Sequence, residues 1–310
     1  MRIVVAGCAG FVGYHLAARL LRDGNEVLGV DNLATGQQKN AADLRESRAF
    51  TFLRHDITTP LDIDGPVDQV YNLACPASPA DFRDKNLEIM AVCSRGIWNL
   101  LDLCAEKSAR LLHTSTSEVY GDPKEHPQRE SYWGNVNPIG PRSCYDEGKR
   151  FAEALITHYR TRRQVQARIA RIFNTYGPRM RRDDGRVLPN FISQALRGEP
   201  LTVHGDGSQT RSFCYVDDMV EGLIRLMNSD VDAPVNLGNP EEITILEFAR
   251  QIVRLADSDS EVRLVPRPPD DPQLRRPDIT RATELLGWSP RVDRDDGLRR
   301  TIDWFRHTAS

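Results

Sequence analysis

An apolar segment followed at once by three regularly spaced glycines constrains the fold more than any other feature of the sequence. Residues 2–7 (RIVVAG) are almost all apolar, and Gly7, Gly10 and Gly13 open a segment with helical periodicity. An apolar run of this length predicts a buried strand. Glycines at this spacing allow a tight turn, a close approach of the backbone to a pyrophosphate, and close packing of a helix on the strand. The segment therefore predicts a strand–turn–helix unit that binds a dinucleotide.

Acidic residues end the next two predicted strands. The apolar run 25–31 (NEVLGVD) ends at Asp31. A carboxylate there can accept hydrogen bonds from a ribose 2′-hydroxyl and would repel a 2′-phosphate, so the sequence favours NAD over NADP as the cofactor. Asp56 ends the following strand and could contact the adenine edge. A helix N-cap or a turn would explain an aspartate there equally well.

Strand-like and helix-like segments alternate through the first half of the chain. Further apolar runs lie at 49–56, 67–74 and 109–116, and a helical stretch lies near 85–107. This alternation predicts the α/β class, with a Rossmann-type doubly wound parallel sheet and right-handed crossovers.

The pattern loosens after about residue 175 into arginine-rich loops and short helices. The segment 266–278 (PRPPDDPQLRRPD) is too rich in proline for a helix or a central strand, so we predict an exposed loop there. A strand near 166–172 is expected in the main sheet. We expect an NAD-binding domain over 1–174, completed by a return segment from the second half, and a smaller C-terminal substrate-binding lobe formed mainly by 175–310.

The composition excludes several classes of protein. The 310 residues carry 41 basic and 44 acidic side chains, and the net charge of −3 gives no reason to expect nucleic acid or an anionic membrane as a partner. No apolar run is long enough to span a bilayer, and the N-terminus lacks the layout of a signal peptide. The six cysteines lack metal-binding spacing, so no metal is predicted and a reducing, cytoplasmic location is expected.

A hydroxyl-rich strand end precedes a Tyr-x-x-x-Lys pair. Residues 114–118 read TSTSE, and Tyr145 and Lys149 follow at helical spacing. Residues four apart are neighbours on a helix, so the Lys149 ammonium can lie beside the Tyr145 phenol and favour a lowered pKa of that phenol. Such a phenol can take a proton from an alcohol while a dinucleotide removes the hydride. The alternative is a surface helix that carries both residues by chance.

Together these motifs resemble those of the extended short-chain dehydrogenase/reductases. Within that family the chain is most similar to the UDP-glucuronate decarboxylases, also called UDP-xylose synthases, and the resemblance covers nearly the whole length. The matching blocks are NLACPASP (72–79), TSTSEVYGDP (114–123), EHPQ (125–128), YWGNVNPIGPRSCYDEGKR (132–150), RIARIFNTYGPRM (168–180), DDGRV (183–187) and GDGSQTRSF (205–213).

The resemblance implies a carboxy-lyase that converts UDP-glucuronate into UDP-xylose with tightly bound NAD. NAD would oxidise C4 of the sugar while Tyr145 acts as the base and Lys149 holds the ribose. The C4 ketone would make the C6 carboxylate a β-keto acid, which loses CO2. Protonation at C5 and return of the hydride to C4 would complete the cycle. The implied catalytic residues are Tyr145, Lys149, Thr116, Ser117, Glu118 and Arg211.

Ser117 distinguishes this reaction from those of related enzymes. The resembling 4,6-dehydratases carry an aspartate there, which expels the C6 hydroxyl as water, and serine is a poor acid for that step. Thr116 and Ser117 would instead stabilise the oxyanion at C4. By the same resemblance Glu118 and Arg211 flank the C5–C6 end of the sugar. A nucleotide-sugar 4-epimerase or 4,6-dehydratase, or a catalytically impaired NAD-binding protein, is the alternative.

The motifs and the resemblance together assign the ligand contacts. The predicted cofactor-binding residues are Gly7, Gly10, Phe11, Val12, Gly13, Asp31, Asn32, Asp56, Ile57, Leu73, Ala74, Tyr145 and Lys149. The predicted substrate-binding residues, around the UDP diphosphate, the sugar and the uracil, are Pro79, Glu118, Asn174, Arg186, Leu201, Thr202, Val203, His204, Arg211 and Arg276.

A homodimer is also expected from the resemblance. Helices near 85–107 and 144–162 match those that form an intersubunit four-helix bundle in related enzymes. Their apolar residues include Leu87, Met90, Leu100, Leu103, Phe151, Leu155 and Ile156. Packing on the sheet would explain many of the same side chains.

Two positions depart from the family pattern. Cys93 stands where relatives generally carry an asparagine that supports the proton relay behind the catalytic lysine. His204 stands where a tyrosine is usual beside the uracil. An imidazole can still stack on a base, so the departure bears on base selectivity rather than on binding as such.

Overall fold

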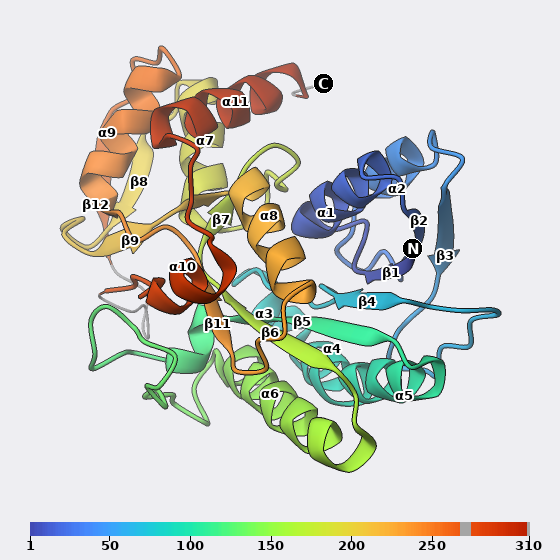
Figure 1. Cartoon of the computed structure of the whole chain (residues 1–310). Helices are drawn as coiled ribbons and strands as arrows, with labels where there is room; N and C mark the ends of the chain where they lie inside the picture. Colours follow the sequence, from blue (N-terminus) through green and yellow to red (C-terminus); the bar gives the residue numbers. More distant parts are fainter. Residues whose placement is uncertain (267–273, 309–310) are drawn as a thin grey trace.

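The computed structural model describes residues 1–266 and 274–308. Within these residues seven parallel strands form a central sheet in the order β11-β6-β5-β4-β1-β2-β3 (Figure 1). The strands are β1 (Arg2–Ala6), β2 (Glu26–Asp31), β3 (Phe50–Arg54), β4 (Gln69–Asn72), β5 (Arg110–Thr116), β6 (Ala167–Ile172) and β11 (Val235–Leu237). The chain order reverses between β1 and β4, which opens a crevice at the carboxyl ends of the strands. The predicted Rossmann-type fold is confirmed.

Helices cover both faces of this sheet. On one face lie α1 (Phe11–Arg22) and α8 (Val216–Met227), and on the other lie α5 (Ile97–Lys107) and α6 (Ser143–Arg163) (Figure 1). The helix predicted near 85–107 consists of three parts: α4 (Asn86–Ala91), the π-helical turn η1 (Val92–Gly96), and α5. The short helices α2 (Gln38–Leu44) and α3 (Asp81–Asp84) complete this half of the chain.

The second half adds small paired strands and further helices. The pairs are β7 (Thr175–Tyr176) with β10 (Cys214–Tyr215), β8 (Leu201–His204) with β13 (Val262–Val265), and β9 (Thr210–Ser212) with β12 (Glu242–Thr244). The helices are α7 (Val187–Arg197), α9 (Ile245–Leu255), α10 (Thr280–Leu286) and α11 (Arg294–His307). Most of the loop predicted over 266–278 lies outside the described residues. Because β11 joins the large sheet, both sides of the predicted boundary at 174 contribute to it, and the division into two domains stays a prediction.

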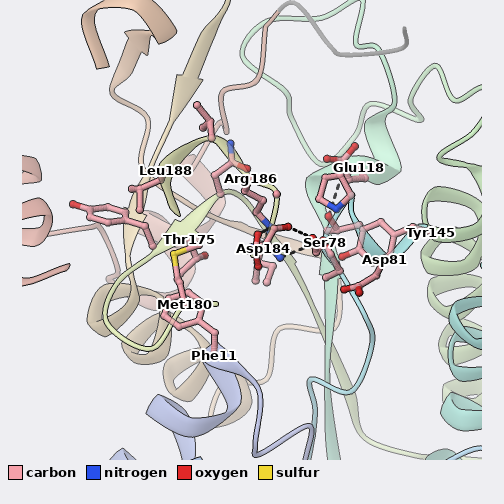
Figure 2. A pocket seen from close by; sticks show the side chains of 18 of the residues that line it. Phe11, Ser78, Asp81, Glu118, Tyr145, Thr175, Met180, Asp184, Arg186 and Leu188 are labelled. Carbon is pink, nitrogen blue, oxygen red and sulfur yellow. Dashed lines mark hydrogen bonds and ion pairs between the residues drawn. The ribbon is translucent and has the colours of Figure 1, made fainter. Parts of the chain in front are cut away.

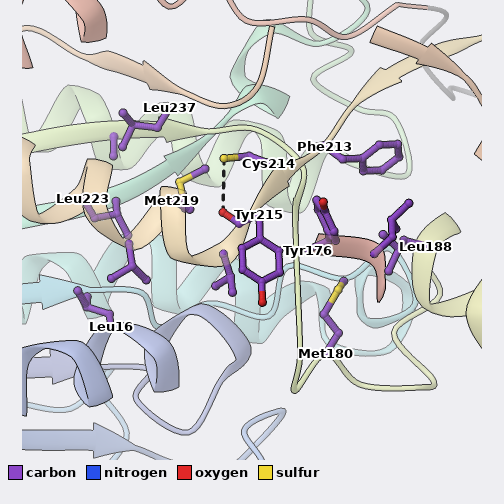
Figure 3. Packing of buried hydrophobic residues seen from close by; sticks show 14 of the residues in the cluster. Leu16, Tyr176, Met180, Leu188, Phe213, Cys214, Tyr215, Met219, Leu223 and Leu237 are labelled. Atoms are coloured by element: carbon purple, nitrogen blue, oxygen red, sulfur yellow. Dashed lines mark hydrogen bonds between the residues drawn. The ribbon is translucent and has the colours of Figure 1, made fainter. Parts of the chain in front are cut away.

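One hydrophobic core joins the sheet to the second half. Leu16 of α1, Met219 and Leu223 of α8, and Leu237 of β11 are all fully buried in it (Figure 3). The same core continues to Phe213, whose ring stacks on Phe248 of α9 at a centroid distance of 4.2 Å. Continuous close packing of this kind holds the two halves in a fixed relation, so residues from both can build one site.

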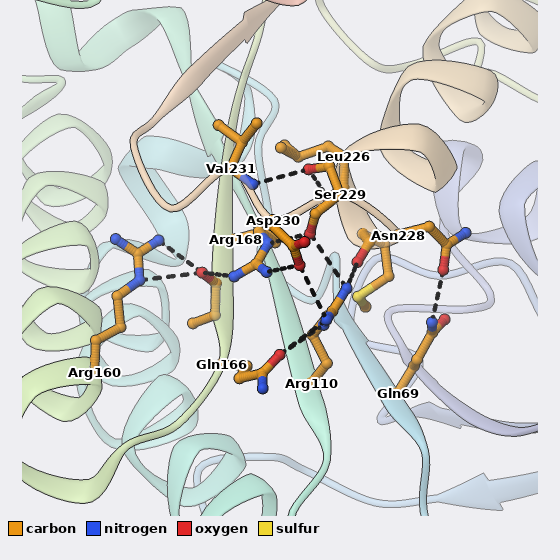
Figure 4. A network of polar contacts seen from close by, with 12 residues as sticks. Gln69, Arg110, Arg160, Gln166, Arg168, Leu226, Asn228, Ser229, Asp230 and Val231 are labelled. Carbon is orange, nitrogen blue, oxygen red and sulfur yellow. Dashed lines mark hydrogen bonds and ion pairs between the residues drawn. The ribbon is translucent and has the colours of Figure 1, made fainter. Parts of the chain in front are cut away.

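A polar network fastens the end of α8 to the amino ends of the strands (Figure 4). Arg110 donates a 2.9 Å hydrogen bond to the carbonyl of Met227, and Arg168 donates one of the same length to the carbonyl of Ser229. Carbonyls at a helix C-terminus lack intrahelical partners and carry partial negative charge, so guanidinium groups stabilise them. These arginines lie at the amino ends of the strands, away from the glycine turn at the carboxyl ends, and have a structural role.

No helix among the described residues has the length and apolar character needed to cross a membrane.

Candidate active site

A cavity of about 890 Å³ opens at the carboxyl ends of the strands. Its walls come from the glycine turn, the end of β5, the start of α6, and the loops and small strands of the second half. Figure 2 shows Glu118 and Tyr145 on one side of the cavity and Leu188, Met180 and Phe11 on the other. A cavity of this size is typical of a site for a cofactor and a substrate together.

The glycine turn leaves backbone, rather than side chains, facing this cavity. A Cβ atom on Gly13 would lie 1.9 Å from the carbonyl oxygen of Gly7, and Gly7 itself has a φ of +85°. Any larger residue at either position would displace the turn. Helix α1 begins directly after Gly10, which provides no side-chain cap, so its first N–H groups are available to an anion. The turn fits a pyrophosphate on these grounds.

Asp31 supports the same turn from the end of β2. Its carboxylate accepts hydrogen bonds from the backbone N–H of Ala9 (3.0 Å) and of Leu33 (2.8 Å). Burial raises the pKa of Asp31, and the two backbone N–H groups oppose that rise. Asn32 donates a 2.9 Å hydrogen bond to Asp56, which ends the neighbouring strand region. Asp31 is therefore in contact with the glycine turn, and Asp56 is hydrogen-bonded to Asn32, the residue that follows Asp31.

Tyr145 and Lys149 lie side by side on α6, as predicted. The Lys149 ammonium is 5.7 Å from the centre of the Tyr145 ring and donates a 2.8 Å hydrogen bond to the carbonyl of Thr114. Burial raises the pKa of Tyr145 to about 12, although Lys149 and a hydrogen bond with Thr116 act in the opposite direction. The lowered pKa expected from sequence is thus absent from the protein alone, because desolvation of the phenolate outweighs the neighbouring cation.

Glu118 occupies a strongly cationic corner of the cavity. One carboxylate oxygen lies 2.9 Å from Nη2 of Arg142 and also forms an ion pair with Nη1 of Arg275. Burial by itself would raise the pKa of Glu118, but the two guanidinium groups lower it to about 2. Asp146 lies beside this cluster and is only 6% exposed. Glu118 is therefore ionised at neutral pH.

The cavity brings together most of the predicted site residues. Those that line it are Gly7, Gly10, Phe11, Val12, Gly13, Leu73, Pro79, Thr116, Ser117, Glu118, Tyr145, Lys149, Asn174, Arg186, Thr202, His204 and Arg211. The predicted residues that do not belong to the described lining are Asp31, Asn32, Asp56, Ile57, Ala74, Leu201, Val203 and Arg276.

Residues outside the lining have clear alternative environments. Successive side chains of β8 point to opposite sides of the strand. Those of Leu201 and Val203 are fully buried in the core, so only Thr202 and His204 of this strand face the cavity. The side chain of Ile57 is buried against α5, and its carbonyl accepts a hydrogen bond from Asn99.

The structure also reveals site residues that the sequence did not indicate. Arg275 contacts Glu118 and is 4% exposed, whereas the neighbouring Arg276, which we predicted, lies 3.8 Å from Glu242. Arg142 forms the second ion pair with Glu118. The paired arginines at 275–276 were a visible signal, but sequence alone could not tell which of two adjacent side chains faces the cavity.

The sequence is similar to those of known proteins over nearly its whole length. Residues 3–238 match the model of the NAD dependent epimerase/dehydratase family. UDP-glucuronic acid decarboxylase 1 of Danio rerio is 53% identical over 304 residues, which are 98% of this chain and 72% of the relative. UDP-glucuronic acid decarboxylase 6 of Arabidopsis thaliana is 53% identical over 307 residues, which are 99% of this chain and 89% of the relative.

Solved structures of nucleotide-sugar 4-epimerases are similar to this chain over nearly its whole length. The UDP-glucose 4-epimerase of Thermotoga maritima, in complex with UDP-glucose, has a TM-score of 0.90 and 27% identity, with full coverage of both chains. The UDP-glucuronic acid 4-epimerase of Bacillus cereus, in complex with UDP-glucuronic acid and NAD, has a TM-score of 0.87 and 29% identity over 99% of each chain. The resemblance predicted from the sequence is confirmed, and the chain belongs to the NAD dependent epimerase/dehydratase family.

Proposed function

We propose that this protein decarboxylates UDP-glucuronate to UDP-xylose with NAD as a bound cofactor. One observation carries the proposal. A Tyr–Lys pair and an ionised glutamate flanked by two arginines open into a single cavity, in a chain whose most similar relatives include UDP-glucuronic acid decarboxylases. An alcohol base and a carboxylate-binding corner are what the reaction requires of the protein.

NAD fits the glycine turn and its surroundings. The first N–H groups of α1 suit the pyrophosphate, and Asp31 at the end of β2 suits the ribose 2′-hydroxyl. We propose that Asn32 and Asp56 contact the adenosine half and that Leu73 lies against the cofactor. NAD held by these residues would supply hydride acceptance from C4 of the sugar and its return at the end of the cycle.

Tyr145 holds and moves the proton of the C4 hydroxyl in this proposal. The buried Lys149 ammonium, fixed on the carbonyl of Thr114, favours the phenolate electrostatically. The Thr116 hydroxyl hydrogen-bonds with Tyr145 and lies at the end of β5, where it can also donate to the C4 oxygen. Ser117 follows directly and is 4% exposed. No acidic side chain takes its place, which suits loss of CO2 better than loss of water.

The corner around Glu118 supplies the charge balance for the sugar carboxylate. Two guanidinium groups and the Glu118 carboxylate leave a net positive charge as long as Asp146 is protonated, and this charge attracts the C6 carboxylate. Glu118 limits that attraction, because a carboxylate held too tightly would resist departure as CO2. Arg211 on β9 lines the same cavity, and we propose that it orients the C5–C6 end.

The remaining cavity residues suit the nucleotide. We propose that Asn174 and Arg186 contact the diphosphate, since a planar guanidinium can bind two phosphate oxygens at once. Thr202 and His204 on β8 would then flank the uracil. Leu201 and Val203 can contribute to that subsite only through their backbone, because their side chains are buried in the core. The second half of the chain thereby acts as the nucleotide-sugar-binding lobe.

Nuclear magnetic resonance in D2O tests the reaction directly. The full chain is incubated with UDP-glucuronate and NAD, and the sugar signals are followed with time. UDP-xylose carrying deuterium at C5 is the expected product, because C5 is protonated from solvent after CO2 leaves. A sugar that keeps C6 would contradict the proposal. A C4 epimer of UDP-glucuronate would instead favour the 4-epimerase function, which the likeness to the Bacillus cereus enzyme makes the second candidate.

We further propose a homodimer formed through α4, α5 and α6. Leu87, Met90, Trp98 and Phe151 on these helices are 73%, 50%, 48% and 48% exposed, an unusual set of large apolar side chains for a free surface. Of the residues predicted for this interface, Leu100, Leu103 and Ile156 pack inside the chain instead.

All six cysteines are free thiols, which supports a reducing, cytoplasmic location.

Sedimentation velocity tests the dimer. Met90→Asp and Phe151→Asp place charges on the proposed interface and are expected to shift the protein towards the monomer. Leu285→Asp on α10 is the matched control, since Leu285 is 55% exposed on a different helix. A parent protein that sediments as a monomer would contradict the proposal.

A further inference from the structure

Two cysteine sulfurs lie in contact next to the candidate catalytic pair. Sγ of Cys75 and Sγ of Cys93 are 3.7 Å apart, and both residues are free thiols. Cys75 follows the end of β4, and Cys93 lies in the π-helical turn η1 between α4 and α5. The two sulfurs therefore join segments that are separate in the sequence and that meet at the cavity wall.

The surroundings of the pair connect it to Tyr145. Cys93 belongs to the same buried cluster as Phe82 and Tyr145, and Cys75 packs against that cluster. Cys93 also packs tightly on α6. A Cβ atom added to Gly148 of that helix would lie only 3.0 Å from the Cβ atom of Cys93. Cys75 is half-buried and lines the cavity. A small oxidant that enters the cavity thus reaches the pair at Cys75.

We propose that Cys75 and Cys93 form an oxidative modification site, at which a peroxide converts the two thiols into a disulfide that reversibly inactivates the enzyme. Formation of the disulfide does not depend on the proposed decarboxylase function; only the loss of that activity does.

The surroundings of the two thiols favour the loss of one proton from the pair. A hydrogen bond from Cys75 lowers the pKa of Cys93 to about 7 despite burial, and the Lys149 ammonium acts in the same direction. The hydrogen bond with Cys93 and burial raise the pKa of Cys75 well above its usual value. The thiolate is the reactive form of cysteine, so a pair that can hold one thiolate beside the Lys149 ammonium is open to oxidation.

The reaction proceeds in two balanced steps. The sulfur that the peroxide meets first attacks one of its oxygens as a thiolate, an S–O bond forms, the O–O bond breaks, and the hydroxide that leaves takes up a proton as water. The other sulfur of the pair then attacks the sulfenic sulfur, an S–S bond forms, the S–O bond breaks, and a second water leaves. Overall, two thiols are oxidised to one disulfide and one peroxide is reduced to two waters.

The disulfide would distort the cavity wall. A disulfide has an S–S distance of about 2.05 Å, so the two sulfurs must approach by roughly 1.6 Å. Because Cys93 is confined against Gly148, most of this movement falls on the segment that carries Cys75. That segment lies beside Tyr145, and a displacement of about 1 Å in an active site can reduce the rate about 100-fold. We expect a loss of at least tenfold for complete conversion.

Peptide mapping combined with activity measurements tests this proposal. The full chain with NAD is treated with hydrogen peroxide, remaining thiols are alkylated, and disulfide-linked peptides are identified by mass spectrometry without reduction. A peptide that links Cys75 to Cys93 should accumulate in step with the loss of UDP-xylose formation, and dithiothreitol should reverse both. Loss of activity without this linkage, or full linkage with unchanged activity, would overturn the proposal.

Two variants separate the site from general thiol damage. The activity of each variant after peroxide treatment is divided by the activity of the same variant before treatment, so that a change in its basal rate does not affect the comparison. Cys93→Ala should resist peroxide at least tenfold better than the parent protein, whereas Cys104→Ala should lose activity as the parent does. Cys104 is equally buried but lies in the separate core cluster under α5. Equal sensitivity of both variants would refute the assignment. If the reduced protein makes no UDP-xylose, the proposed function has failed, and peptide mapping still decides whether the disulfide forms.

Discussion

The side chain of Lys149 donates a 2.8 Å hydrogen bond to the carbonyl oxygen of Thr114, and this contact ties helix α6 to strand β5 at the level of Tyr145. Lys149 is 3% exposed, so its position is fixed by the fold rather than by solvent. Its charge therefore acts on the Tyr145 phenol from a constant place. Burial raises the pKa of Tyr145 in the protein alone, and Lys149 is the largest opposing influence.

Replacing Lys149 should impair proton transfer more than substrate binding. Lys149→Met removes the cation that favours the phenolate, so we expect kcat to fall by about 100- to 10,000-fold. The acidic limb of the kcat against pH profile should move to higher pH. Lys107→Met, at the C-terminus of α5 and outside the cavity lining, is the control and should behave as the parent. An unchanged pH profile would show that Lys149 does not set the pKa of the base.

Gly13→Ala should weaken NAD binding without unfolding the protein. The new Cβ would lie 1.9 Å from the carbonyl oxygen of Gly7, so the turn that faces the pyrophosphate must move. We expect the Kd for NAD to rise by a factor of at least about ten, or 1.4 kcal/mol, in isothermal titration calorimetry. Gly24→Ala, just beyond the other end of α1, is the control, because nothing lies within 4 Å of the Cβ that it adds. Equal effects of both changes on NAD affinity would count against the clash as the cause.

Asp31→Asn should reduce the preference for NAD over NADP. The charge that repels a 2′-phosphate disappears, while one oxygen remains to accept a hydrogen bond from Ala9 or Leu33. We expect the ratio of the two dissociation constants to change by about tenfold in favour of NADP, with NAD itself bound more weakly. Asp23→Asn, at the end of α1, should leave both constants unchanged.

The strands of the site were predictable from local sequence, because buried parallel strands are short, nearly continuous apolar runs. β1 and β2 follow that rule and lead into the glycine turn and Asp31, whereas β5 is apolar only at Leu111 and Leu112 before its hydroxyl-rich end. The glycine spacing and the Tyr-x-x-x-Lys pair are equally local, since each depends on contacts within one turn or one helix. Family resemblance added the identity of the substrate, which no local pattern contains.

The cationic corner was less predictable, because it depends on contacts between distant segments. Arg142 precedes α6 and Arg275 follows the segment that the structure leaves undescribed, yet both meet the carboxylate of Glu118. The sequence shows many arginines in this region, and only the fold selects the two that face the cavity. The pKa of Tyr145 is a similar case: spacing reveals the nearby cation, whereas burial, which outweighs it, requires the packed structure.

The Glu118–Arg275 pair should contribute to stability in a pH-dependent way. Arg275→Met leaves Glu118 with one guanidinium fewer in a buried site, so we expect a loss of about 3 kcal/mol in the free energy of unfolding at pH 7. The folded pKa of Glu118, about 2, lies below its unfolded value of about 4.5. The contribution is thus complete above pH 4.5 and disappears as the pH falls towards 2.

Urea denaturation of a double-mutant cycle measures this coupling. Glu118→Gln, Arg275→Met and the double variant are compared at pH 7 and at pH 3. The double variant should be less destabilised at pH 7 than the sum of the single variants, and the difference should shrink at pH 3. Additive effects at both pH values would show that the two groups do not interact.

Asp146 should oppose stability at neutral and higher pH. It is 6% exposed, and one of its oxygens lacks a hydrogen-bond partner among the described residues. Burial, together with the charge of Glu118, raises its pKa from 3.8 to about 7. Above pH 7 the folded protein must hold this carboxylate ionised, whereas below about pH 4 it is protonated in both states. The penalty therefore grows as the pH rises from 4 to 7 and is constant above that range.

Asp146→Asn removes this penalty and should stabilise the protein at pH 8. We expect a gain of about 1–3 kcal/mol in the free energy of unfolding, part of the roughly 4 kcal/mol that a shift of this size represents. The gain should decline as the pH is lowered from 7 to 4, which distinguishes it from a change in packing. Asp303→Asn on the exposed face of α11 should show no such dependence. If Asp146→Asn changes stability equally at pH 8 and pH 5, the ionisation of Asp146 is not the cause, since only a charge on the carboxylate links its effect to pH.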